Sequence, residues 1–147
     1  MRFVRIALIL AVAAVPFGNA PGAGARASLG VDLSGAAEVP AGSGDADGAG
    51  VGSIVLKTRT KRLCWEITFS NIDAPNKGHI HRGPVDQDGP VFFTLFDNGS
   101  TVSSPATGCS KAKRSLLKEI QADPGGFYVN LHNAAFPDGA IRGQLHT

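Results

Sequence analysis

Two histidines separated by a single residue, His79 and His81, are the side chains of this chain best placed to do chemistry. On a β-strand, residues i and i+2 point to the same face, so both imidazoles can converge on one ion. His132 follows another β-type run, and a third imidazole from a neighbouring strand would complete a site suited to copper or zinc. The alternative is structural: the histidines donate hydrogen bonds to loop carbonyls and orient the turn at 83–89.

Three further polar residues accompany the histidines in the pattern. Arg142 could serve an anionic ligand near such an ion, or it could only pair with Glu38 or with an Asp on a neighbouring loop. Asn130 has the structural interpretation of a hydrogen-bonding residue at a strand end. No nucleophile elbow, P-loop or zincin helix occurs in the sequence, so hydrolase and phosphotransferase functions have no support.

The N-terminal segment has the order of a secretory signal peptide. Arginines at positions 2 and 5 precede an apolar run over 6–17, which small residues follow. We predict a signal peptide over 1–27, cleaved after Ala27, with Ala20 and Ala25 as alternatives. The unbroken apolar core, 6–15, is much shorter than the roughly 20 residues of a membrane-spanning helix. The protein is therefore expected to be secreted, extracellular or periplasmic, without a membrane span.

The remaining residues, 28–147, suffice for one domain and are too few for two. They contain 11 basic and 12 acidic residues, a net charge of −1, so no overall field attracts the protein to nucleic acid or an anionic membrane. Basic residues gather at 57–62 and 111–114. Such clusters could meet a polyanion such as a sulfated glycan, although basic residues at hairpin tips usually serve solubility.

Cys64 and Cys109 are the only cysteines. In an exported chain, an even pair predicts a disulfide, and the absence of a Cys-x-x-Cys pair argues against a redox role. We therefore predict a structural Cys64–Cys109 bridge.

The elements that must position these residues are β-strands. Short runs of apolar alternation are separated by Gly, Pro, Asn and Asp, which is typical of all-β domains. We predict about seven strands and one short helix at 115–122, folded as an antiparallel Greek-key β-sandwich or flattened barrel of the immunoglobulin or superoxide dismutase kind. The strands are predicted at 29–33, 51–58, 63–69, 78–82, 91–96, 127–132 and 140–146.

Two segments are expected to be loops. The stretch 40–50 is rich in Gly, Ala, Ser and Asp and has no large apolar residue, so we expect it to be mobile and without core contacts. The stretch 98–110 is also predicted to be a loop.

Four segments together resemble the CHRD (chordin-type) domain family. They are LSGAAEVP at 33–40, GHIHRG at 78–83, YVNLH at 128–132 and DGAIRGQL at 138–145. They fall in the family's order, and the resemblance spans residues 29–146. It implies an extracellular module that occurs alone in bacterial secreted proteins and repeated in chordin, and whose biochemical activity is not established.

A fainter resemblance is to copper/zinc superoxide dismutases. In those enzymes an H-x-H pair and a later histidine bind copper, and a C-terminal arginine guides the anion; His79, His81, His132 and Arg142 are similar in type and order. Between His81 and His132 the chain has none of the additional ligands of the bridged zinc site. Only the copper half of such a centre could be built here.

Two functions from different classes follow. The first is a non-catalytic extracellular binding or structural module, whose partner is an unidentified protein or glycan. The second is a metal-binding protein, holding copper or zinc on the three histidines and with a possible redox activity. The oligomeric state is not indicated by the sequence.

Overall fold

Apolar and polar alternation builds a single sheet of eight strands in the computed structural model, which describes residues 26–147. The strands are β1 (Arg26–Ser34), β2 (Ala49–Lys57), β3 (Arg62–Ser70), β4 (Lys77–Arg82), β5 (Val91–Asp97), β6 (Ala106–Lys111), β7 (Phe127–His132) and β8 (Ile141–His146). One α-helix, α1 (Arg114–Ala122), and two 3-10 turns, Gly35–Ala37 and Pro124–Gly126, complete the described elements.

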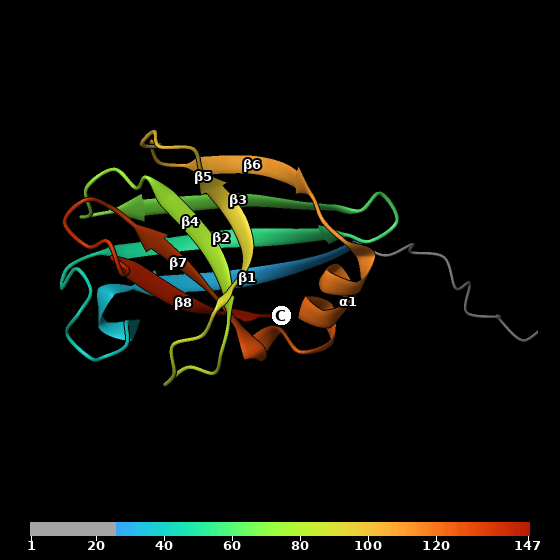
Figure 1. Ribbon diagram of the computed structural model, residues 1–147, viewed down its shortest axis with the longest axis horizontal. Helices are drawn as coiled ribbons and strands as arrows, with labels where there is room; N and C mark the ends of the chain where they lie inside the picture. Colours follow the sequence, from blue (N-terminus) through green and yellow to red (C-terminus); the bar gives the residue numbers. More distant parts are fainter. Residues whose placement is uncertain (1–25) are drawn as a thin grey trace, which may run out of the picture.

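The sheet is antiparallel throughout and curls into a nearly closed, flattened barrel (Figure 1). Its strand order is β5-β4-β7-β8-β1-β2-β3-β6, and the two edge strands, β5 and β6, come into contact. The connections β3–β4 and β6–β7 join strands that are not neighbours in the sheet, and the connection β5–β6 joins its two edges; such crossovers are typical of Greek-key folds. The predicted all-β architecture with one short helix is confirmed.

The core is formed by every second residue of the long strands. Apolar side chains from β1, β2, β3 and β8 meet inside the barrel, and α1 adds Leu117 and Ile120, which are both fully buried. The predicted hairpin of β2 and β3 buries the residues expected from its pattern. These are Ile54, Leu56, Leu63, Trp65 and Ile67.

One predicted loop is wrong in part: the segment 98–110 contains most of β6. Among the strands of residues 26–147, this strand pairs with β3 alone, from Arg62↔Lys111 to Ile67↔Ala106. As an edge strand it has few large apolar side chains, so its sequence lacks the alternation that marks the other strands. Pairing with β3 and the covalent bond to Cys64 define it instead.

The expectation that 40–50 makes no core contact is also wrong. The Asp45 amide donates a hydrogen bond to the Ala140 carbonyl at 2.9 Å, and Gly48 is buried. A Cβ at Gly48 would lie 2.6 Å from the Ile72 side chain and 2.7 Å from that of Ile141. The backbone itself packs where a side chain would not fit, so the lack of large apolar residues does not exclude packing.

The predicted signal peptide, 1–27, and the cleavage alternatives Ala20 and Ala25 lie almost wholly outside the described residues, and β1 begins at Arg26. Within the described part, no helix has the length and apolar character needed to cross a membrane.

The predicted disulfide is present. Cys64 on β3 faces Cys109 on β6 in the antiparallel register, and their sulfurs are bonded. The bridge attaches the edge strand β6 to its neighbour β3 across a sequence separation of 45 residues.

Replacing both cysteines, Cys64→Ala with Cys109→Ala, should lower the free energy of unfolding by about 3–4 kcal/mol, because the unfolded chain regains the entropy of a long open loop. Denaturant unfolding followed by circular dichroism measures this difference, and the reduced wild-type protein is the control. An unchanged unfolding midpoint would show that the bridge contributes nothing to stability.

Candidate metal centre

Strands β4, β7 and β8 lie side by side and place their polar residues on one face. In the register, His79 lies opposite Asn130, His81 opposite Tyr128, and Asn130 opposite Arg142. The polar side chains of this face include His79, His81, Tyr128, Asn130, His132, Arg142 and Gln144. The alternate residues, among them Ile80, Val129 and Leu131, point into the apolar core.

The structure brings His79, His81 and His132 together. One nitrogen from each ring lies within 4.8 Å of the others, and His79 Nδ1 is 3.2 Å from His132 Nε2. Ligands at 2.0–2.1 Å from one ion would lie about 3.3–3.6 Å apart, so small ring rotations would close the set. The fourth histidine, His146, lies outside this group and is 3.3 Å from Asp32 on β1.

Outer hydrogen bonds set the orientation of two of these rings. His81 Nδ1 lies 2.9 Å from the Gly89 carbonyl oxygen, and His132 Nδ1 lies 3.1 Å from that of Pro137. A carbonyl only accepts, so each Nδ1 carries the proton and each neutral ring has its lone pair on Nε2. This arrangement, an outer N–H on a carbonyl and an inner lone pair, is how metal-binding histidines are normally oriented.

His81 Nε2 is the most informative atom of the cluster. It is buried and has no hydrogen-bond partner among the described residues. An unpaired buried acceptor costs free energy, so a cation bound there would relieve the cost.

His79 permits two arrangements. Its Nε2 is 3.9 Å from Asp97 Oδ2; if that nitrogen is protonated, the Nδ1 lone pair faces the lone pair of His132 Nε2. A metal ion would bind both lone pairs. If Nδ1 is protonated instead, it donates to His132 Nε2 and the pair is purely structural.

The rings are in an environment that keeps them uncharged. Burial lowers the pKa of His79 and that of His81 below the usual histidine value. For His132, burial and then the neighbouring charges of His79 and His81 lower the pKa to about 4. Neutral imidazoles at pH 7 are the form that binds metal without first losing a proton.

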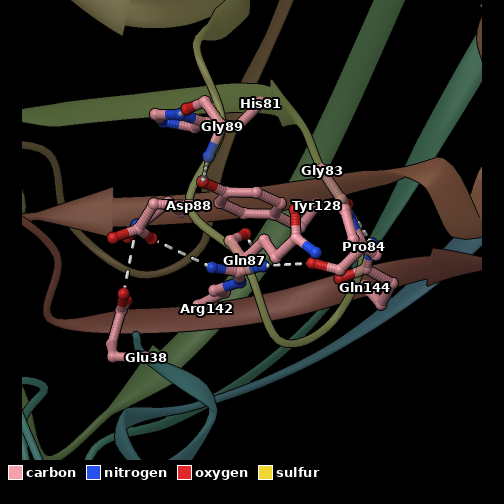
Figure 2. Close-up of polar contacts among 11 residues, drawn as sticks. Glu38, His81, Gly83, Pro84, Gln87, Asp88, Gly89, Tyr128, Arg142 and Gln144 are labelled. Carbon is pink, nitrogen blue, oxygen red and sulfur yellow. Dashed lines mark hydrogen bonds and ion pairs between the residues drawn. The ribbon is translucent and has the colours of Figure 1, made fainter. Parts of the chain in front are cut away.

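Arg142 makes the contacts expected of the structural alternative rather than of an anion site. It is 1 % exposed, and it donates to the Pro84 carbonyl at 2.8 Å, to the Gln87 carbonyl at 2.9 Å and to Asp88 Oδ1 at 3.2 Å (Figure 2). All these hydrogen-bond partners belong to the loop between β4 and β5. The guanidinium therefore holds this loop against the polar face.

Tyr128 lies between Arg142 and the histidines, so the guanidinium does not open toward them. Its ring stacks on His81 at 4.9 Å between centroids, and the Arg142 guanidinium carbon lies 3.4 Å from its centre (Figure 2). The Tyr128 hydroxyl accepts a hydrogen bond from the Gly89 amide at 3.1 Å, next to the carbonyl that orients His81. Tyr128 thus connects Arg142, which holds the β4–β5 loop, to His81, a candidate metal ligand.

The sequence analysis missed Tyr128, Gln144, and the carbonyls of Gly89 and Pro137 as contributors to the site; Gln144 Nε2 donates to the Gly83 and Gly125 carbonyls at 2.7 and 2.6 Å. Two carried a signal, because Tyr128 shares the period-two face of Asn130 and His132, and Gln144 shares that of Arg142. The carbonyls carried none, since every residue has one.

Glu38 lies under the same face. It is 4 % exposed and accepts a hydrogen bond from Asn130 Nδ2 at 3.3 Å, while Glu38 Oε1 and Asn130 Oδ1 have no partner among the described residues. Burial raises the pKa of Glu38 to about 7, although Arg142 and Asn130 oppose the rise. Of the two partners predicted for Arg142, Glu38 or an Asp on a neighbouring loop, the structure has the second, an ion pair with Asp88 (Figure 2).

Comparison with known proteins gives one result. The family model of the CHRD domain matches residues 29–145. No curated protein and no solved structure matches the chain.

Replacing Glu38 with glutamine should remove a pH dependence of stability. The carboxyl has a higher pKa folded, about 7, than unfolded, near 4.5, so the folded state binds the proton more tightly. The Glu38 contribution to stability should fall by up to about 3 kcal/mol as the pH rises from 4.5 to 7.5, whereas the lowered pKa of His132 raises stability over the lower part of this range. The stability of the wild type minus that of Glu38→Gln isolates the Glu38 contribution and should fall over this range.

Urea unfolding at several pH values measures the difference. Glu119→Gln is the matched control, since Glu119 forms an exposed ion pair with Arg82 and its loss should cost less than about 1 kcal/mol at any pH. Parallel curves for wild type and Glu38→Gln would refute a buried, proton-binding Glu38.

Proposed function

This chain belongs to the CHRD domain family, and we propose that it is an exported domain that binds one copper or zinc ion on His79, His81 and His132. The observation that carries the proposal is the orientation of the histidine rings. In His81 and His132 a backbone carbonyl holds the outer N–H, so that Nε2 faces the cluster. His81 Nε2 is buried and has no hydrogen-bond partner among the described residues. Imidazole ligands suit both metals, and copper(II) binds such sites more tightly than zinc.

The disulfide and the family support export to an oxidising compartment, extracellular or periplasmic, after removal of the predicted signal peptide. The leading interpretation of the sequence, a non-catalytic binding or structural module, is compatible with a bound ion, since a metal can serve structure as well as catalysis. Three protein ligands leave a fourth coordination position for water or a small ligand. Arg142 is bound to its loop, so anion guidance of the superoxide dismutase kind is not part of the proposal.

Titration of the purified protein with Cu(II) and with Zn(II) should show one equivalent bound, retained on dialysis. Removal of one ligand, as in His79→Gln, should weaken binding by more than about 100-fold, beyond the 10–100-fold typical of losing an outer partner. Calorimetry and metal analysis after dialysis measure both.

His146→Gln is the matched control, because it removes a histidine outside the cluster and should bind metal as the wild type does. Bound metal should also raise the unfolding free energy, by about 2.7 kcal/mol at 100 times Kd. The proposal fails if the wild type retains no metal, or if His146→Gln and His79→Gln lose it equally.

A further inference from the structure

Positive charge is concentrated at one end of the barrel, although residues 28–147 have a net charge of −1. Eight of their eleven basic residues come from two segments that the fold joins: Lys57, Arg59, Lys61, Arg62, Lys111, Lys113, Arg114 and Lys118. The β2–β3 turn and α1 lie at the same end, on the right of Figure 1.

Backbone contacts fix this juxtaposition. Arg62 pairs with Lys111 in the β3–β6 register, and the Ala112 amide donates to the Lys61 carbonyl at 2.9 Å. Arg114 Nε donates to the Thr58 carbonyl at 3.2 Å, which holds the start of α1 against the turn. The cations are therefore held close together by the scaffold.

No carboxylate within residues 26–147 forms an ion pair with these cations. The ion pairs of the described chain involve His79, Arg82, Arg142 and His146 instead. Like charges held together without counter-charges repel, so an anionic ligand gains energy that a mixed surface would not provide.

The cluster is also concave. Two hollows, of about 640 and 240 Å³, adjoin at Arg114, which lines both. The larger is lined by Thr60, Lys61, Lys111, Ala112, Lys113 and Arg114, and the smaller by Thr58, Arg59, Arg114 and Lys118. Cations that line two hollows sharing Arg114 suit a chain with several anionic groups better than one small ion.

We propose that this surface, the basic groove, binds a sulfated polysaccharide. No aromatic side chain lines either hollow, so the stacking platform that single-stranded nucleic acids use is absent from this part of the described chain. Sulfate groups need only cations and hydrogen-bond donors, which the lysines, arginines and threonines provide. The proposal is independent of the metal centre.

The test uses heparin as the sulfated polysaccharide, with binding to the purified protein measured across salt concentrations. The wild type should bind with an affinity that falls steeply with salt, corresponding to the release of at least about four counterions. The slope of log affinity against log salt concentration reports the number of counterions released. In the triple variant Lys111→Gln/Lys113→Gln/Lys118→Gln this number should fall by about three, and heparin should bind at least about tenfold more weakly at low salt.

Two single variants distinguish an effect of the position of the removed cation from an effect of net charge. Lys113→Gln should reduce the salt slope by about one, whereas Lys77→Gln, which changes the net charge equally at an exposed residue of β4, should leave it unchanged. Circular dichroism confirms that each variant is folded. The proposal is overturned if heparin does not bind, if Lys77→Gln weakens binding as much as Lys113→Gln, or if single-stranded DNA competes as well as heparin.

Discussion

Strand β7 is buried at all six of its residues, yet every second side chain in it is polar. Val129 and Leu131 belong to the apolar core, while Tyr128, Asn130 and His132 face away from it under the loops. Buried polar groups must find partners, so the loops that cover this face have to supply donors and acceptors at fixed positions. The carbonyls of Gly89 and Pro137, the carboxyl of Glu38 and the clamp of Arg142 are those partners. The arrangement of the three histidines depends on this constraint.

Arg142 shows how closely the loop and the centre are connected. Desolvating a guanidinium is costly unless its N–H groups are bonded, and two carbonyls and one carboxylate of the loop between β4 and β5 bond them. The same loop carries Gly89, whose carbonyl orients His81. A residue that resembled an anion guide in the sequence thus contributes to the candidate centre through its loop, which fixes the tautomer of His81.

Strand pattern and motif spacing predicted much of the fold and of the site. The H-x-H pair, His132, the disulfide, the helix and the core residues of the β2–β3 hairpin follow from period-two alternation, helical spacing and cysteine pairing. The sequence did not reveal β6, because an edge strand needs few apolar residues, nor the packing of 40–50, because buried glycine backbone leaves no hydrophobic signal. It also did not place Tyr128 between Arg142 and His81, since which face each strand presents to which loop depends on the tertiary register.

The central claim is that the inner nitrogens of three histidines form one metal site. Crystals grown with zinc and measured at its absorption edge would locate the ion directly by anomalous scattering. One strong peak should lie about 2.0–2.1 Å from His79 Nδ1, His81 Nε2 and His132 Nε2, with the outer nitrogens of His81 and His132 still bonded to the Gly89 and Pro137 carbonyls. Zinc bound elsewhere, with His79 Nδ1 still hydrogen-bonded to His132 Nε2, would contradict this claim and make the three histidines a structural element of the fold.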